Sequence, residues 1–219
     1  ACSSTTERDA DYLWNNNYLY TSTLAEWAIE RGIRFIYASS AATYGDGKQG
    51  FSDDHKIIRQ LKPINMYGYS KQVFDLRVLR NALEKKIAGI KFFNVFGPNE
   101  YHKGDMTSVI FKAFHQIRET GKVKLFKSYK KEYKDGGQLR DFVYVKDCVD
   151  AMWWLFNNPK ANGIYNLGTG KARTWNDLIK AVFKAMKKKT KIEYIEKHSN
   201  TLVLQGYAFY LDKSFFTFF

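Results

Sequence analysis

Tyr67 and Lys71 are the pair of residues in this sequence best suited to proton transfer. They are four positions apart, and residues at i and i+4 share one face of a helix. An ammonium beside a phenol favours the phenolate, so such a tyrosine can exchange protons near neutral pH. The other Tyr-x-x-x-Lys, from Tyr44 to Lys48, crosses two glycines, which disfavour a helix. The context therefore favours Tyr67 as the catalytic tyrosine.

Ser40 is a third candidate, because it lies in the run Ser39-Ser40-Ala41-Ala42 directly after an expected strand at residues 33–38. Open α/β sheets bind ligands outside the carboxyl ends of their strands. A serine there could hydrogen-bond a substrate hydroxyl or carbonyl, although the run could also be an ordinary turn of small residues. A serine at a strand end followed by Tyr67 and Lys71 is a more specific combination than any of its parts.

The elements that must position these residues alternate between helices and strands. Such alternation predicts an α/β fold with a doubly wound, Rossmann-like parallel sheet, here partial, and a smaller C-terminal α/β region. Apolar spacing and glycine stops predict helices over residues 13–28, 65–87, 105–119, 147–157 and 174–187. The expected strands are 33–38, 90–95, 123–126, 140–145, 164–167 and 192–195, with an exposed loop over 127–138.

Composition excludes several classes of protein. The 219 residues are 45% apolar and 26% charged, which suits one globular core rather than a disordered chain. No apolar run is long enough for a membrane helix, and the first residues lack the features of a signal peptide. Two cysteines suit a reducing cytoplasm, and four histidines without a Cys-x-x-Cys predict no metal site.

The start of the sequence predicts a fragment. The chain begins at Ala1, not at a methionine, and the sequence at Ala1 resembles sequence from the middle of a domain. No Gly-x-Gly-x-x-Gly turn joins a strand directly to a helix, as a dinucleotide-binding fold requires. We therefore expect that the first βαβ units are missing, and that this chain alone is inactive.

The net charge of +13 is concentrated in residues 121–191, which carry 17 basic and 6 acidic side chains. A nucleic-acid surface is one interpretation, and a site for an anionic small molecule is another. A solvated lysine-rich surface is favoured, because no zinc knuckle, helix-turn-helix or RNA-binding aromatic motif accompanies the charge. We expect no nucleic-acid partner and no membrane contact.

Four segments carry a resemblance to a known superfamily: residues 38–45 (ASSAATYG), 67–71 (YGYSK), 93–98 (FNVFGP) and 140–145 (RDFVYV). In this order they resemble the extended short-chain dehydrogenase/reductase superfamily, whose members include nucleotide-sugar epimerases and dehydratases. Residues 1–7, 16–18 and 102–106 narrow the resemblance to the epimerases of ADP-heptose. The resemblance covers about residues 1–196.

The resemblance implies epimerisation at C6″ of ADP-D-glycero-D-manno-heptose, giving the L-glycero epimer for lipopolysaccharide. The family uses NADP for transient oxidation to a ketone and re-reduction, and NAD remains possible here. A UDP- or dTDP-sugar 4-epimerase or a dehydratase is the alternative. Dehydratases usually have Asp-Glu after the strand-end residue, where this chain has Ala41-Ala42. A non-catalytic truncated remnant is a further alternative.

The resemblance also assigns roles to residues. Tyr67 and Lys103 would be the two proton handlers, Ser40 would bind the reacting oxygen, and Lys71 would hold the nicotinamide ribose. A loop lysine such as Lys103 is otherwise an ordinary surface residue. The remaining cofactor-lining positions would be Ala1, Cys2, Ser3, Asn16 and Val95, together with Lys71 and Lys103.

The ADP-sugar substrate would meet Ser40, Asn94, Asp105, Lys112, Phe126, Lys127, Ser128, Tyr129 and Arg140. An arginine suits a diphosphate because its guanidinium donates two parallel hydrogen bonds, and a salt bridge to Asp141 or Asp147 is the alternative. The family forms homo-oligomers, and by the same resemblance a homopentamer is expected. The domains would be residues 1–97, with the catalytic residues of the cofactor domain, and 98–196, mostly for substrate, before an atypical tail at 197–219.

Overall fold

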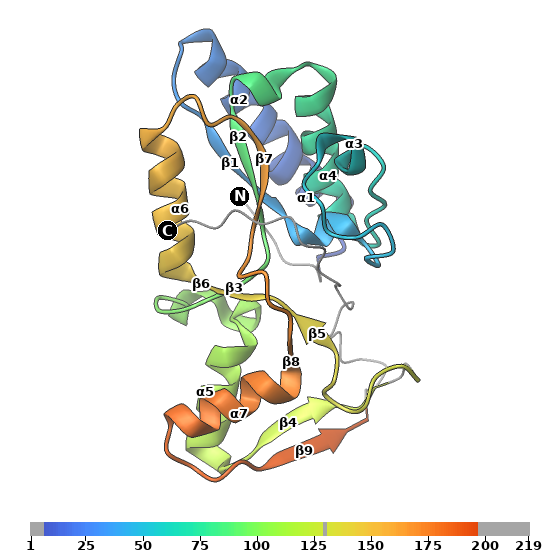
Figure 1. The fold of residues 1–219 in the computed structure, drawn as a ribbon, viewed down its shortest axis with the longest axis vertical. Helices are drawn as coiled ribbons and strands as arrows, with labels where there is room; N and C mark the ends of the chain where they lie inside the picture. The colour runs from blue at the N-terminus through green and yellow to red at the C-terminus, as the bar shows by residue number, and fades with distance from the viewer. Residues whose placement is uncertain (1–6, 129–130, 197–219) are drawn as a thin grey trace.

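The computed structural model describes residues 7–128 and 131–196. Three parallel strands form its main sheet, in the order β1 (Ile36–Ser40), β2 (Ala88–Phe92) and β7 (Gly163–Leu167). A smaller α/β region lies at the other end of the molecule (Figure 1). The predicted α/β fold with parallel strands is confirmed.

Helices cover both faces of the main sheet (Figure 1). Successive strand residues point to opposite faces, so Tyr37 of β1 packs in one core cluster with Phe74 and Val78, while Ala88 and Ile90 of β2 pack with Leu155 on the other face. Phe74 and Val78 belong to α4 (Met66–Arg80), and Leu155 belongs to α6 (Val145–Asn157). This arrangement is the doubly wound one that the alternating pattern predicts.

The first predicted helix is interrupted. It consists of α1 (Ala10–Leu13), a six-residue π-helical segment η1 (Trp14–Leu19) and α2 (Tyr20–Glu30). The Asp9 side chain accepts a hydrogen bond from the Tyr12 amide at the start. Gly32, with φ of 63°, follows the end, as the predicted glycine stop requires.

The helix α4 begins where it is predicted and ends earlier. The Asn65 side chain caps it by accepting from the Gly68 amide at 2.7 Å. It ends at Arg80 instead of continuing to residue 87, because Ala82 adopts a left-handed conformation with φ of 52° before the short helix η3 (Leu83–Lys85). Two short helices between β1 and α4 were not predicted, η2 (Ala41–Tyr44) and α3 (His55–Ile58).

Two predicted strands are each divided in the structure. The strand predicted over 90–95 divides at Phe93 into β2 and β3 (Asn94–Phe96), and β3 pairs with β6 (Phe142–Tyr144). The strand predicted over 140–145 divides at Asp141 into β5 (Leu139–Arg140) and β6, and β5 pairs antiparallel with the unpredicted β8 (Arg173–Thr174). In both places the chain changes its strand partner, which local sequence does not reveal.

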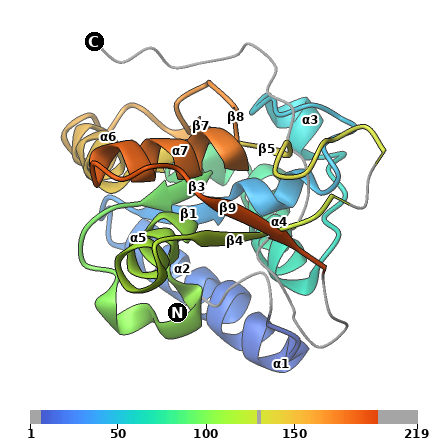
Figure 2. The ribbon, with the colours of Figure 1, turned by 90° about the horizontal axis from the view of Figure 1, so that it is seen from below.

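The smaller region pairs β4 (Val123–Phe126) with β9 (Ile192–Ile195) in parallel, as Figure 2 shows. Its helices α5 (Val109–Thr120) and α7 (Trp175–Ala185) share a core that includes Ile117, Ile179 and Phe183. The helix predicted to start at 105 starts at Val109, because a short 3₁₀ helix, η4 (Tyr101–Met106), precedes it. The division of the chain at residue 97 stays a prediction.

Within residues 127–128 and 131–138, no helix or strand forms, in agreement with the predicted loop. None of the helices in the described part of the chain is long and apolar enough to cross a lipid bilayer. Among the same residues, no group of three or more His, Cys, Asp or Glu side chains could hold a metal ion.

Candidate active site

The amino-terminal turns of α4 lie against the carboxyl end of β1, and this contact defines the candidate site. The Lys71 ammonium donates a hydrogen bond to the Ala38 carbonyl at 3.1 Å and lies 5.9 Å from the centre of the Tyr67 ring. The one-turn spacing read from the sequence therefore does bring the cation beside the phenol ring. Lys71 is 7% exposed, so its ammonium lies where water screens its charge little.

Close packing between α4 and η2 depends on Gly68. A Cβ atom at this position would lie 2.7 Å from the Ala42 carbonyl oxygen, which is closer than real Cβ contacts. Glycine in the first turn of α4 therefore lets Tyr67 and Lys71 approach the loop that contains Ser40.

Ser40 ends β1 and caps η2. Its hydroxyl oxygen accepts a hydrogen bond from the Ala42 amide at 3.1 Å. The side chain is half-buried, which fits a group that orients a ligand. Ser40, Tyr67 and Lys71 are thus placed by two adjacent elements, although they are 31 residues apart at most along the chain.

Asn17, not Asn16, links η1 to α4. The Asn17 amide donates to the Ser70 hydroxyl at 3.0 Å, and that hydroxyl donates to the Tyr67 carbonyl at 2.8 Å. The Asn16 amide donates instead to the Tyr12 carbonyl within its own helix. Sequence reasoning missed Asn17, and the role assigned to Asn16 stays a prediction.

Lys103 lies on η4, in a loop that is organised by a buried carboxylate. Its ammonium is 4.0 Å from Oε2 of Glu100, whose side chain is 5% exposed. The Glu100 carboxylate also accepts hydrogen bonds from the Ser108 amide at 2.6 Å, the Ser108 hydroxyl at 2.7 Å and the Gly97 amide at 3.3 Å. Glu100 was not predicted, because a single glutamate in a polar loop carries no distinguishing signal.

Asn94 and Arg140 both lie at the junction of β3, β5 and β6. The Asn94 amide donates to the Asp141 carbonyl at 3.0 Å. Arg140 is 2% exposed, its guanidinium lies 5.7 Å from the Trp175 ring centre, and burial lowers its pKa to about 10. Arg140 therefore stays charged at neutral pH.

The Asp141 carboxylate, one of the alternative partners considered for Arg140, holds the turn after β7. It accepts from the Thr169 amide at 2.9 Å, the Thr169 hydroxyl at 2.6 Å and the Gly170 amide at 2.8 Å. Asp141 is fully buried, at 1% exposure. The turn containing Thr169 and Gly170 is thereby fixed beside Asn94 and Arg140.

The other predicted substrate residues lie in the smaller region. Phe126 ends β4, the Lys127 ammonium contacts the Glu196 carboxylate at 2.7 Å, and the Ser128 amide donates to Asp135 at 2.7 Å. Lys112 lies on α5. Val95, which was predicted to line the cofactor and not the substrate, pairs with Val143 between β3 and β6. Outside the residues described are Ala1, Cys2, Ser3 and Tyr129, and likewise the side chain of Asp105.

The spacing Gly-x-Gly-x-x-Gly does occur, at Gly45, Gly47 and Gly50, but it forms turns and not a phosphate-binding loop. The Gly47 amide donates to the Tyr44 carbonyl and the Gly50 amide to the Gly47 carbonyl. No helix begins until His55. A Cβ at Gly45 would lie 2.0 Å from the Lys62 carbonyl oxygen, so close backbone packing explains that glycine.

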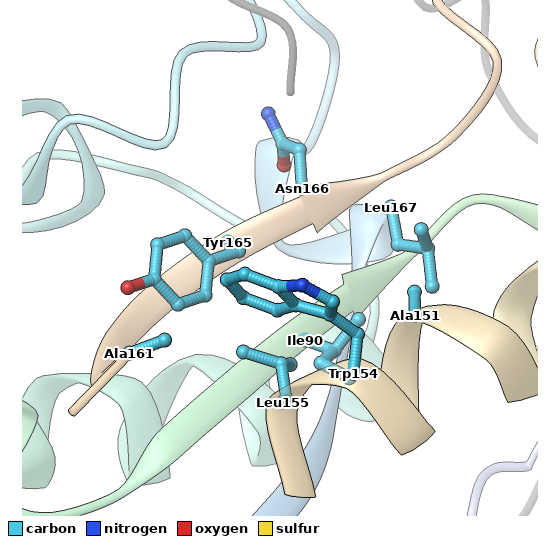
Figure 3. A pocket seen from close by; sticks show the side chains of 8 residues that line it. All are labelled: Ile90, Ala151, Trp154, Leu155, Ala161, Tyr165, Asn166 and Leu167. Carbon is cyan, nitrogen blue, oxygen red and sulfur yellow. The ribbon is translucent and has the colours of Figure 1, made fainter. Parts of the chain in front are cut away.

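An apolar hollow lies between α6 and the strands β2 and β7 (Figure 3). It lies on the sheet face opposite α4 and is lined by Ile90, Ala151, Trp154, Leu155, Ala161, Tyr165, Asn166 and Leu167. The Tyr165 hydroxyl donates a hydrogen bond to the Asn162 carbonyl at 2.6 Å. Because it lies on the face of the sheet opposite α4, this hollow is not part of the candidate site.

The side chains at the end of β1 suit the nicotinamide end of a dinucleotide. Lys71 supplies donors for ribose hydroxyls and Tyr67 supplies an exchangeable proton. The buried Oδ1 atom of Asn17, beside Ser70, has no hydrogen-bond partner among the described residues, and buried polar atoms of this kind call for one. The residues present therefore fit such a group.

Comparison with known proteins defines the class of this chain. Residues 1–168 match the NAD dependent epimerase/dehydratase family, and the chain belongs to this family of enzymes. A relative from Nitratidesulfovibrio vulgaris, named ADP-L-glycero-D-manno-heptose-6-epimerase, is 62% identical over 196 residues, which are 90% of this chain and 61% of the relative. A protein of the same name from Fusobacterium nucleatum is 53% identical over 188 residues, 84% of this chain and 57% of that one.

The crystal structure of the Helicobacter pylori ADP-L-glycero-D-manno-heptose-6-epimerase resembles the fold with a TM-score of 0.77 at 32% identity. The match covers 90% of this chain and 60% of that one. The chain thus spans about three fifths of the length of these relatives. The resemblance indicated by the sequence motifs, and the Rossmann-like fold that it implies, are confirmed.

Proposed function

We propose that this protein is an epimerase that inverts C6″ of ADP-D-glycero-D-manno-heptose with NADP as its cofactor. The observation that carries the proposal is the placement of Tyr67 and Lys71 against the carboxyl end of β1, in a chain that is 62% identical to a protein named for this reaction. The product would supply the heptose of lipopolysaccharide, and the reaction would take place in the cytoplasm.

Inversion at one carbon requires proton handling on two faces of the sugar. Tyr67 would exchange a proton with the oxygen on C6″ on one face, and Lys103 would do so on the other. NADP, held at its nicotinamide ribose by Lys71, would supply reversible hydride transfer at C6″ when bound. Ser40 would hold the reacting oxygen by a hydrogen bond, so that the two proton handlers meet the same atom.

Other residues would bind the two ligands. Lys71 would hold the ribose beside the nicotinamide, and Arg140 would neutralise the diphosphate of the ADP-sugar, since a buried guanidinium is a strong partner for such an anion. The choice of NADP over NAD rests on the family resemblance. The two cofactors differ at the adenosine ribose, and none of the residues named here is assigned to contact that ribose. A homopentamer is proposed on the same basis.

Replacement of the two proton handlers tests the mechanism. We expect that Tyr67→Phe and Lys103→Met each lower the rate of C6″ epimerisation by about 100-fold or more, which is the usual contribution of a general acid–base group. The measurement is chromatographic separation of the two ADP-heptose epimers after incubation of the purified full-length protein with NADP, because this chain alone is expected to be inactive. Bound nicotinamide, followed by its absorbance, should be unchanged in both variants.

Matched controls are Tyr69→Phe, on the same helix but 53% exposed, and Lys160→Met, an exposed lysine in the turn after α6. Both should retain the activity of the original protein. Full activity of Lys103→Met would remove that lysine from the mechanism. Conversion of a UDP-hexose with no change in either ADP-heptose epimer would favour a 4-epimerase instead.

A further inference from the structure

A buried ion pair lies directly beneath the candidate site. Asp75 of α4 and Lys91 of β2 are both 0% exposed, and their charged groups are 2.5 Å apart. Removing two charges from water costs free energy, so a buried pair adds little net stability compared with an apolar pair of the same size. A role in positioning neighbouring groups therefore explains the ion pair better than a contribution to stability does.

The aspartate side of the pair fixes the last residues of β1. One Asp75 oxygen accepts a hydrogen bond from the Tyr37 hydroxyl at 2.8 Å, and the other accepts from the Ser39 hydroxyl at 2.7 Å. Burial, together with the Asp75 carboxylate, raises the pKa of Tyr37 well above its ordinary value, so this hydroxyl remains a donor. Asp75 thus attaches α4 to the residue immediately before Ser40.

The lysine side of the pair reaches Ser40 itself. The Lys91 ammonium donates to the Thr43 hydroxyl at 2.7 Å, and that hydroxyl donates to the Ser40 carbonyl at 2.8 Å. Thr43 is 0% exposed, so water cannot replace either hydrogen bond. An unbroken series of contacts therefore joins Asp75, through Lys91 and Thr43, to the backbone of Ser40.

We propose that Lys91 is a positioning residue for Ser40, acting through the Thr43 hydroxyl, with Asp75 as its counter-ion. This inference rests on the proposed function, in which the Ser40 hydroxyl holds the reacting oxygen. The Ser40 hydroxyl keeps the required direction only while η2 keeps its shape. This Ser40 hydroxyl also accepts a hydrogen bond from the Ala42 amide. Lys91 itself would touch neither substrate nor cofactor.

Thr43→Val is the variant that tests the proposal with least disturbance. It removes the linking hydroxyl and keeps the branched shape and the ion pair, whereas Lys91→Met would leave the Asp75 charge buried without its partner and could unfold the protein. We expect kcat to fall by about 10-fold with KM changed by less than about two-fold, the signature of a lost transition-state interaction. Thr43→Ser, which retains the hydroxyl, should restore most of the activity.

The control is Thr120→Val, at the end of α5, where the hydroxyl also donates to a backbone carbonyl, that of Gln116 at 2.8 Å. It should leave kcat unchanged. In a Ser40→Ala background, Thr43→Val should have less than about a two-fold further effect, because coupled residues are not additive. An equal loss of kcat in both backgrounds would overturn the proposal, since Thr43 would then act independently of Ser40.

A second measurement does not depend on the substrate. Hydrogen exchange of the Ala42 amide reports the shape of η2, because this amide donates to the Ser40 hydroxyl. We expect about 10-fold faster exchange in Thr43→Val and no change in Thr43→Ser or Thr120→Val. Faster exchange in a protein that does not epimerise ADP-heptose would reject the proposed function but support the positioning role. Unchanged exchange in Thr43→Val would overturn the inference whatever the activity.

Discussion

At the scale of single residues, the candidate site depends on buried polar groups that bind to other polar groups of the chain. Glu100 is the clearest example, because one carboxylate accepts hydrogen bonds from Gly97 and from two groups of Ser108, and its Oε2 atom is 4.0 Å from the Lys103 ammonium. A carboxylate can accept at both oxygens, whereas an amide has one acceptor oxygen and two donor hydrogens. The loop that carries Lys103 therefore requires an acid at position 100.

We expect Glu100→Gln to lower the epimerisation rate by about 10-fold and to destabilise the protein by about 1–3 kcal/mol, the cost of unsatisfied buried donors. The rate is measured with ADP-heptose, and the free energy of unfolding by urea titration. Glu119→Gln on the exposed face of α5 is the control, because the Glu119 side chain is 61% exposed. An unaltered rate in Glu100→Gln would show that the Lys103 loop does not need this carboxylate.

At the scale of elements, the site depends on how closely α4 approaches β1 and η2. Gly68 permits that approach, since any Cβ there would meet the Ala42 carbonyl. The same residue is costly for the helix, because glycine in a helix is less favourable than alanine by about 1 kcal/mol. The sequence retains a poor helix former where packing requires it.

Gly68→Ala therefore separates helix propensity from packing. If propensity dominated, the variant would be more stable by about 1 kcal/mol. We expect the opposite, a lower free energy of unfolding and a loss of activity of about 10-fold or more. The new Cβ would clash with the Ala42 carbonyl, so the backbone of η2 must move away from α4 and therefore from Tyr67. Circular dichroism during urea unfolding and the epimerase assay measure both effects. A more stable variant with full activity would contradict the proposed close packing.

At the scale of the whole molecule, Asp141 joins segments that are far apart in the chain. Its carboxylate holds Thr169 and Gly170 after β7, and its carbonyl accepts from the Asn94 amide. A Cβ at Gly168 would lie 2.4 Å from an Asp141 carboxylate oxygen, so the turn packs tightly around the acid. The end of the main sheet and the junction of β3, β5 and β6 are thus held as one unit.

Asp141→Asn should destabilise the protein by about 2–3 kcal/mol, because hydrogen bonds to a buried charged group are lost and an amide donor faces amide donors. We expect the urea midpoint to fall with little change in the slope of the transition. Asp150→Asn, an exposed acid on α6, is the control and should unfold as the original protein does. An unchanged midpoint for Asp141→Asn would mean that these contacts do not hold the turn.

The local sequence predicts the elements well where one face of each is consistently apolar. The strands β4 and β9 and the start of α4 agree with their predicted residues, because periodicity and capping are properties of neighbouring residues. Predictions were wrong where a chain segment changes its strand partner, at Phe93 and at Asp141. The choice of a partner strand depends on residues that are distant in sequence.

The sequence by itself predicted the α/β class and, through the resemblance of its motifs, the family. It also indicated Ser40, Tyr67 and Lys71 as candidate site residues, because residue type and short spacing are local properties of the chain. The three-dimensional structure alone revealed the contacts of Asp75, Lys91 and Glu100, whose side chains are ordinary charged residues in the sequence. The physical reason is burial: a charged group removed from water must find partners, and those partners come from whichever elements the fold brings together.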